Sequence, residues 1–469
     1  MRKIAIAFAA FALLTAACGQ YPDVHEDAVA AGEIAPAGTS GLTAEPGATL
    51  PDGSTVPGTT LPDGSTVPGT GTTGTGTTGT GTTGTGTTGT GNTGTGSGTT
   101  TPTGGGTTTG VTPTTIKIGI HAPLTGAAPL KAESFNAGKD LYWDKGANGQ
   151  PVVINGRKVE VVFQDDQYNP SHARAVCQQM AEEEQVFLLI GGGGTDQIQA
   201  CAAYAASQGI PYFSPGVTEI GVNRLPNYFA VSMSYADQAP LLAQYIKANA
   251  DALGWSGDPA KIAIVATNTP NFQDAVDAFK QAMPGVKEFR PEKNERGSSM
   301  AGQLCTGTIK NYEVVFPLTA PTYFLEMAGA SKCEPQYVGV GVTHGLDQVA
   351  DTGCQTGGVA DSRFFSPGPA FADANEYAPD FLKAGGKDDI MQLLWGISKT
   401  LHQLFLKAGP NLSREGFIAS TSNASVKSGV FPDLTYTPTN HFGARQVHVL
   451  RADCSQGAYV TEKAFASSF

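Results

Sequence analysis

The sequence predicts an α/β protein with two doubly wound parallel sheets. From residue 114 onward, short apolar runs alternate with helical segments, which is the pattern of repeated strand–helix units. The run at residues 186–190 (VFLLI) is apolar throughout, as expected for a strand that is buried on both faces of a sheet. After about Asp237 the alternation starts again, and this restart indicates a second sheet.

The expected elements follow in a regular order along the chain. In the first half we expect strands at residues 116–120, 159–163, 186–190 and 210–213, and helices at residues 134–145, after Asn169-Pro170 and from Thr195-Asp196. Asn169 is a good helix cap and Pro170 suits the first helical position. In the second half we expect helices at residues 238–249 and 272–283 and strands at residues 261–266, 314–316 and 337–340.

The chain before residue 114 has a different composition. Residues 19–113 contain no Lys or Arg, residues 49–59 repeat as residues 60–70, and a Thr-Gly alternation follows to about Thr109. Such a segment cannot bury enough apolar surface to offset the conformational entropy of its chain. We therefore expect residues 18–113 to form a disordered, flexible tether.

The N-terminus has the pattern of an export signal. Arg2 and Lys3 precede an apolar run at residues 4–14, and small residues stand before Cys18. Cys18 resembles the diacylated cysteine of the bacterial lipobox, although Thr15 stands where that motif prefers Leu. We therefore expect residues 1–17 to be a lipoprotein signal peptide and Cys18 to carry the lipid anchor on the extracytoplasmic face of the cell membrane. The alternative is ordinary cleavage, which would leave Cys18 as an unpaired thiol.

Charge and motifs argue against several other classes of protein. The 469 residues carry 41 Asp+Glu against 29 Lys+Arg, a net charge of −12, and no basic patch that would neutralise nucleic-acid phosphates. The glycine run at residues 191–194 is followed by neither Gly-Lys-Ser/Thr nor the third glycine of the dinucleotide fingerprint. The chain has no Gly-x-Ser-x-Gly elbow and no Cys or His pair at metal-ligand spacing. Adjacent strand residues point to opposite faces, so Asp165-Asp166 indicates loop structure or a solvated edge rather than a catalytic pair. We expect no cofactor and no metal.

Several motifs together resemble the leucine/isoleucine/valine type of periplasmic binding protein. They are residues 116–120 with 123–126 (PLTG), residues 163–166 (FQDD) with Asn169-Pro170, residues 190–191, and residues 209–211 (GIP) running into 214–218 (SPGVT). The resemblance implies two lobes joined by a three-strand hinge, with crossings near Met233-Ser234, Phe364-Phe365 and Phe431-Pro432. Residues 114–234 and 365–431 would form lobe 1, and residues 235–364 and 432–469 would form lobe 2.

The same resemblance implies a ligand site between the lobes. Thr195 holds the position after the glycine turn, where family members offer a hydroxyl and a backbone N–H to the ligand carboxylate. A helix N-terminus also favours an anion there. Thr218 matches a second contact position, with Val217 beside it. The alternative is that Thr195 and Thr218 only cap the helices that they begin.

The second lobe offers further candidate contacts to the ligand. Asn271 and Phe272 lie where the family usually has an aromatic residue over the ligand, although Phe272 suits core packing as well. Gly341 takes the place of the acidic residue with which amino-acid binders neutralise the ligand ammonium. A buried unpaired ammonium is costly, so we expect a carboxylate, an amide or another small polar metabolite rather than a plain branched-chain amino acid.

The cysteines that remain after Cys18 are even in number, which in an exported domain indicates disulfides. The bridge common in the family would join positions that here are Tyr168 and Gly194, so it is absent. Mapped onto the family's lobes, the cysteines pair within a lobe as Cys177–Cys201, Cys305–Cys333 and Cys354–Cys454.

The resemblance implies a monomeric solute-binding lipoprotein of a branched-chain-amino-acid-type ABC importer, with a membrane permease as its partner and no catalytic activity. The alternative is a ligand-binding receptor of the same fold that signals to a membrane partner. The long tether favours capture, because a flexible link transmits no conformational change. A secreted α/β enzyme is a remote third possibility, since the catalytic motifs are missing.

Overall fold

The computed structural model describes residues 106–217, 221–222 and 224–469. The expected signal peptide, Cys18, most of the tether and Thr218 lie outside these residues. None of the helices in the described part of the chain is long and apolar enough to span a membrane.

The first lobe is built on a six-stranded sheet with the order β2-β3-β1-β4-β5-β6. Its strands are β1 (Thr115–Ala122), β2 (Val153–Ile154), β3 (Arg157–Asp165), β4 (Leu188–Gly191), β5 (Tyr212–Ser214) and β6 (Tyr228–Ala230). Every neighbouring pair is parallel except β2 with β3, which form a short hairpin at one edge. The crossover helices cover both faces of this sheet, which explains why β4 is apolar throughout.

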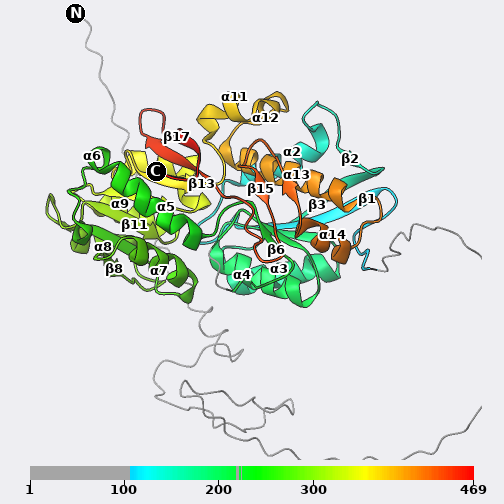
Figure 1. Ribbon diagram of the computed structural model, residues 1–469, viewed down its shortest axis with the longest axis horizontal. Coiled ribbons are helices and arrows are strands. Elements are labelled where there is room, and N and C mark those ends of the chain that lie inside the picture. Colours follow the sequence, from blue (N-terminus) through cyan, green and yellow to red (C-terminus); the bar gives the residue numbers. More distant parts are fainter. Residues whose placement is uncertain (1–105, 218–220, 223) are drawn as a thin grey trace, which may run out of the picture. The chain divides into compact units, whose positions relative to one another are not determined.

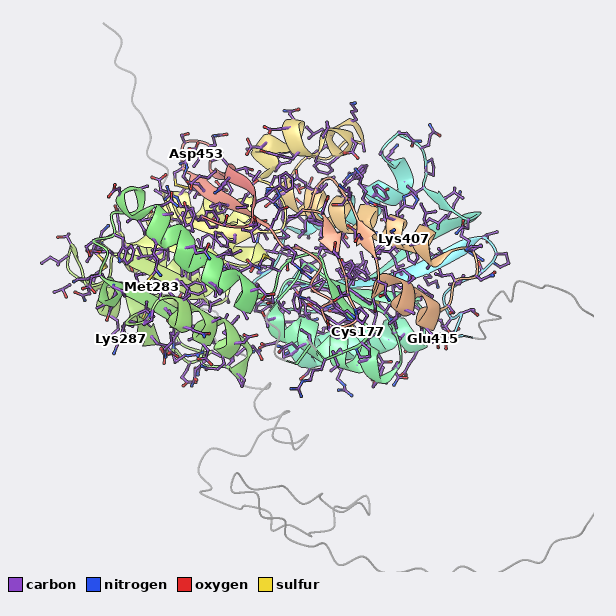
Figure 2. The ribbon with its side chains drawn as sticks, in the orientation of Figure 1. Cys177, Met283, Lys287, Lys407, Glu415 and Asp453 are labelled. Atoms are coloured by element: carbon purple, nitrogen blue, oxygen red, sulfur yellow. A yellow bond between two sulfur atoms is a disulfide. The ribbon has the colours of Figure 1, made fainter. Side chains whose placement is uncertain are left out.

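Helices pack on both faces of this sheet (Figure 1). One face carries α2 (Ala132–Lys145) with α13 (Asp389–Ala408) and α14 (Arg414–Thr421), and the other carries α3 (Pro170–Glu182) with α4 (Thr195–Ser207). Side chains of β4 alternate between them. Leu188 and Ile190 join the core that contains Phe135 of α2, whereas Leu189 joins the core that contains Cys177 of α3, which Figure 2 labels.

The second lobe is built on a seven-stranded sheet with the order β17-β16-β13-β12-β11-β7-β8. Its strands are β7 (Ile262–Ala266), β8 (Lys287–Phe289), β11 (Val314–Leu318), β12 (Gln336–Val340), β13 (Arg363–Ser366), β16 (Val447–Asp453) and β17 (Ala458–Ala466). The first five are parallel, and β16 and β17 add an antiparallel edge. The prediction of two doubly wound, mostly parallel sheets is confirmed.

The remaining elements complete the second lobe and its links. Helices of this lobe are α5 (Tyr235–Ala248), α6 (Ala250–Leu253), α7 (Gln273–Ala282), α8 (Gly297–Leu304), α9 (Pro321–Ala330) and α10 (Asp347–Thr356). Two short ladders join β9 (Cys305–Thr306) to β10 (Ile309–Lys310) and β14 (Ser425–Val426) to β15 (Leu434–Thr435). Helices α11 (Ala374–Tyr377) and α12 (Pro379–Lys383) lie between β13 and α13.

The chain passes from one sheet to the other after β6, after β13 and before β16. The last passage comes later than the crossing expected near Phe431-Pro432. Phe442 still forms a bridge with Ala230 of β6, and the Gly443 N–H donates to the Ala230 carbonyl at 2.9 Å. Residues 432–442, which we expected in lobe 2, therefore come before the last passage, and Phe442 pairs with the edge strand of the first sheet.

The folded region also begins earlier than the composition indicates. The Thr107 N–H and hydroxyl donate to the Glu415 carboxylate of α14 at 2.8 and 2.9 Å, and the Arg414 N–H donates to the Thr107 carbonyl. Residues 106–113, which we expected in the tether, thus belong to the fold. They attach mainly through polar contacts, and Val111 packs against the core. One apolar side chain gives no hydrophobic pattern, so the composition did not indicate this attachment.

Three disulfides are present, and each joins a pair proposed from the sequence: Cys177–Cys201, Cys305–Cys333 and Cys354–Cys454. The first links α3 to α4 in the first lobe, and the other two lie within the second lobe. None of them crosses between the lobes, so the disulfides leave relative movement of the two sheets unrestricted.

Candidate functional site: a cleft between the two sheets

A cavity of about 300 Å³ lies between the two lobes. It is lined by segments that follow β1, β3, β4, β5 and β6 of the first sheet and β7, β8, β11 and β12 of the second. All of these segments come after the carboxyl ends of parallel strands. This edge is where open α/β sheets bind their ligands, because loops there surround a crevice that the strands do not fill.

The glycine turn after β4 brings backbone N–H groups to the cavity. The first hydrogen bond of α4 runs from the Ile198 N–H to the Gly194 carbonyl at 3.0 Å, so the N–H groups of Thr195, Asp196 and Gln197 have no partner within the helix. A Cβ on Gly194 would lie 1.9 Å from the Gln197 Oε1, so any side chain at this position would have to displace the Gln197 amide. The arrangement favours an anion at the start of α4.

A buried network of polar side chains, formed by His121, Asp166 and Tyr212, packs against the strand that leads into this turn. His121, at the end of β1, places its Nδ1 2.8 Å from the Asp166 Oδ2 and its Nε2 2.7 Å from the Tyr212 hydroxyl, and His121 and Asp166 are fully buried. A Cβ on Gly191 would lie 1.7 Å from the Tyr212 hydroxyl. The network therefore fixes the backbone that leads into the turn. Sequence analysis assigned none of the histidines a function, because the three partners stand far apart in the chain.

The same histidine belongs to the one group of potential metal ligands in the described residues, with Cys177 and Cys201. Both sulfur atoms are in a disulfide, and both ring nitrogens of His121 already have hydrogen-bond partners. Metal coordination would require a free thiolate and a free imidazole nitrogen. This group therefore does not fit a metal ion.

Tyr168 and Tyr235 are two of the tyrosines that line the cleft. Burial, with the nearby carboxylates of Asp196 and Asp166, raises the pKa of Tyr168 to about 12. Burial also raises the pKa of Tyr235 well above its usual value. Both residues line the cavity, and both remain protonated at neutral pH. Each can therefore donate a hydrogen bond to an oxygen of a bound molecule.

Tyr235 also explains the glycine at position 341. Gly341 has a φ of +108°, and a Cβ there would lie 2.9 Å from the Tyr235 hydroxyl. An acidic side chain at this position would need an unfavourable backbone and would meet the phenol. Where an acidic side chain was expected in an amino-acid binder, this protein has the neutral hydroxyl of Tyr235, the first residue of α5.

A polar contact joins the two lobes across the mouth of the cleft. Asp196, on α4 of the first lobe, pairs with the Lys293 Nζ at 2.5 Å and accepts a hydrogen bond from the Asn271 side-chain amide, both in the second lobe. We name these three residues the clasp. The Asp196 side chain is 24% exposed and that of Lys293 is 60% exposed, so the clasp lies in contact with solvent.

The buried polar atoms of the second lobe that lack hydrogen-bond partners in the described structure include the Thr269 hydroxyl, after β7, and the His344 Nε2, after β12. Both residues line the cavity. Burial lowers the pKa of His344 to about 4, so its imidazole is neutral and uncharged at the cleft. Buried polar atoms without partners indicate positions that a bound molecule would satisfy.

The structure brings together most of the residues singled out in the sequence. Thr195, Val217 and Phe272 line the cavity, and Gly341 lies between the lining residues Val340 and Val342. Asn271 does not line the cavity but belongs to the clasp. Tyr168, Tyr235, Thr269 and His344 were missed in the sequence. Thr269 and His344 closely follow predicted strands, a position that could have identified them.

Comparisons with known proteins agree with this geometry. A family model described as a periplasmic binding protein matches residues 115–458. The chain belongs to this family. No curated protein sequence matches this periplasmic binding protein. As the family implies, it is an extracytoplasmic binding protein, and its activity is binding rather than catalysis.

Solved structures of similar fold include solute-binding proteins of ABC transporters. A fatty acid ABC transporter substrate-binding protein from Thermomonospora curvata is 19% identical with a TM-score of 0.64, covering 78% of this chain and 96% of that one. The leucine-binding protein LivK from Thermotoga maritima is 16% identical with a TM-score of 0.61, covering 74% and 98%. A solute-binding protein of an ABC transporter from R. palustris, in complex with 4-hydroxybenzoate, is 16% identical with a TM-score of 0.61, covering 75% and 96%.

Proposed function

We propose that this periplasmic binding protein is the lipid-anchored solute-binding component of an ABC importer and that its cargo is a small carboxylate. The observation that supports this proposal is the cavity between the two lobes, at the carboxyl ends of the strands of both sheets. The assignment to an ABC importer is supported by solved structures of similar fold that are solute-binding proteins of ABC transporters. A binding protein that closes around its cargo needs two lobes that can move, and the intralobe disulfides leave that movement free.

The donors in the cleft support a carboxylate. The start of α4 offers the unpaired N–H groups of Thr195, Asp196 and Gln197, and Tyr168 and Tyr235 offer phenolic hydroxyls. Hydrogen bonds to an ionised acceptor are roughly twice as strong as neutral ones. Relatives of the same fold are described in complex with 4-hydroxybenzoate and 3,4-dihydroxybenzoic acid, and one is a fatty acid carrier.

The acidic residues of the cleft do not provide a site for an ammonium group. Asp196 is already paired within the clasp. Glu292 accepts a hydrogen bond from Asn268, and Glu326 accepts one from the Gly297 N–H. Both glutamates and Glu295 are exposed at the mouth of the cleft rather than in its interior. An α-amino acid would therefore bury its ammonium without a counter-charge, which is costly.

A thermal-shift screen of the exported protein, with its cysteines oxidised, tests the ligand class. The panel contains short and long carboxylates, aromatic acids, amino acids, amides, polyamines and sugars. A ligand at 100 times its Kd should add about 2.7 kcal/mol to the free energy of unfolding. We expect hits among carboxylates and aromatic acids that weaken about tenfold in Thr195→Ala. Tight binding of a branched-chain amino acid would contradict the argument from Gly341.

The lipid anchor needs its own test. Cell fractionation of the wild-type chain and Cys18→Ala should place the first in the membrane fraction and release the second. If both forms were released, Cys18 would be an ordinary residue of the mature N-terminus. Copurification of a permease with the anchored chain would support the importer over a signalling receptor.

A further inference from the structure

A smaller cavity of about 60 Å³ adjoins the cleft behind the glycine turn. The two cavities share the lining residues Gly192, Gly193, Pro215, Val342 and Thr343. We propose that this second cavity, here named the tail chamber, receives the apolar end of the cargo. The cargo is then a carboxylate with an aliphatic or aromatic tail. This inference rests on the proposed function and specifies the ligand class of the same site.

One wall of the tail chamber is a helix face. Ile390, Leu394 and Ile397 of α13 line it, at spacings that place them on one side of the helix. Their exposed fractions are 4%, 7% and 4%. The wall is therefore apolar and already shielded from solvent, so a tail that enters the chamber leaves water almost completely.

The opposite walls come from both lobes. Ile120 of β1, Ile190 of β4 and Phe135 of α2 belong to the first lobe, whereas Leu346, which precedes α10, belongs to the second. All four side chains are buried. Because Leu346 completes the enclosure from the second lobe, a tail in the chamber contacts both lobes and favours the closed arrangement.

The chamber offers water few partners. His121 lines it, but both ring nitrogens are engaged by Asp166 and Tyr212, so only its carbon edge is available. Thr343 is the other lining residue with a polar side chain. A buried water typically needs two to four polar partners, so this cavity suits an apolar group better than solvent.

The glycine turn lies along the border of the two cavities, and Gly192 and Gly193 line both of them. A Cβ on Gly193 would lie 2.9 Å from Pro123, so the turn is packed closely against the first lobe. Because Pro215, Val342 and Thr343 also line both cavities, a carboxylate held at Thr195 can extend its tail along this shared lining.

Calorimetric titration of the exported protein with acetate, butyrate, hexanoate, octanoate and decanoate tests the proposal. While methylenes enter the chamber, each should tighten the Kd about fourfold, and the gain should stop once the chamber is full. Hexylamine and octylamine, which carry similar tails without the carboxylate, should bind at least tenfold more weakly than the acids of matching length.

Variants of α13 give a matched comparison. Leu394→Phe fills the chamber and should weaken octanoate binding at least tenfold more than butyrate binding. Leu406→Phe, on the same helix but with Leu406 50% exposed, should leave the whole series unchanged. Ile397→Ala enlarges the chamber and should move the plateau to longer acids. If either chamber variant fails to fold, titration of the unaltered protein with acids of increasing length still tests whether the chamber receives the tail.

The outcomes separate the two proposals. Equal affinity for butyrate and octanoate would overturn the tail chamber while leaving the carboxylate function intact. Binding of no carboxylate of any length would overturn both. A chain-length dependence that survives unchanged in Leu394→Phe would place the tail elsewhere and overturn the chamber.

Discussion

The carboxylate of Asp389 accepts a hydrogen bond from the backbone N–H of Asp347 at 2.7 Å, and this contact joins the two lobes. Asp389 begins α13 of the first lobe, and Asp347 begins α10 of the second. Leu346, the N-cap residue of α10, makes no side-chain cap hydrogen bond, so Asp389 caps that helix from the other lobe. The contact lies beside the crossings that form the hinge.

Stability should therefore depend on the protonation of this pair. Burial, with Asp347 and Asp388 nearby, raises the pKa of Asp389 to about 7, and burial and Asp388 also raise the pKa of Asp347. Besides these carboxyl groups, the pair faces the N–H groups of Ile390 and Tyr459. Between about pH 4 and pH 7 the folded state holds a proton that the unfolded state has released, so stability falls as pH rises through this window.

Thermal unfolding of Asp389→Asn across pH 4.5 to 7.5 checks this prediction. The neutral amide should flatten the decline in stability and add on the order of 2 kcal/mol at pH 7.5. Asp258→Asn is the matched control, because Asp258 also caps a helix but lies away from the hinge. If the stability of Asp389→Asn fell with pH as steeply as that of the unaltered protein, the Asp347–Asp389 pair would not determine how stability depends on pH.

The sequence predicted the parallel core well because its signal is local. The expected strands at residues 116–120 and 314–316 lie within β1 and β11, since buried parallel strands are continuous apolar runs. The strands β16 and β17 and the long helix α13 were not expected. Strand β16 is largely buried but includes His448 and Arg451, and β17 is mostly half-buried or exposed, so neither is a continuous apolar run. The resemblance to the family is also weaker after Pro270.

The site was predictable only in part, for a different reason. Thr195 and Val217 could be placed because they match contact positions of the family that the sequence resembles, and both line the cavity. Tyr235 could not, because its relation to Gly341 joins residues more than a hundred positions apart in the chain. The tail chamber likewise depends on α13 returning to the first sheet, which no local pattern shows.

Gly341 should tolerate no side chain. Gly341→Ala forces a φ of +108° on an L-residue and brings its Cβ to 2.9 Å from the Tyr235 hydroxyl. We expect a loss of about 1–3 kcal/mol in the free energy of unfolding, measured by denaturant titration. Adding Tyr235→Phe should recover only the part due to the contact. Gly302→Ala, in α8 with open space around it, should be neutral or stabilising. A Gly341→Ala protein as stable as Gly302→Ala would refute this reading of the backbone.

The disulfides should differ in their accessibility to reductants. Cys454 is exposed, whereas Cys177 and Cys201 are both 0% exposed. Dithiothreitol under native conditions should therefore open Cys354–Cys454 first, as mass spectrometry after thiol alkylation would show. Because that bridge spans 100 residues, its loss should cost about 3–5 kcal/mol. Alkylation of Cys177 before Cys454 would show that the first lobe opens more readily than its burial indicates.

The clasp should slow release of the cargo rather than determine which cargo binds. Asp196→Asn removes the charge that pairs with Lys293 across the cleft mouth, and a solvent-exposed ion pair contributes up to about 1 kcal/mol. Stopped-flow measurements with the tightest-binding carboxylate should show dissociation about two- to fivefold faster, with a smaller difference at high salt because salt screens exposed pairs. Lys427→Gln breaks a more exposed pair with Asp433 and should not change the rate. If Asp196→Asn instead abolished binding, Asp196 would contact the cargo directly, and the clasp would be part of the binding site.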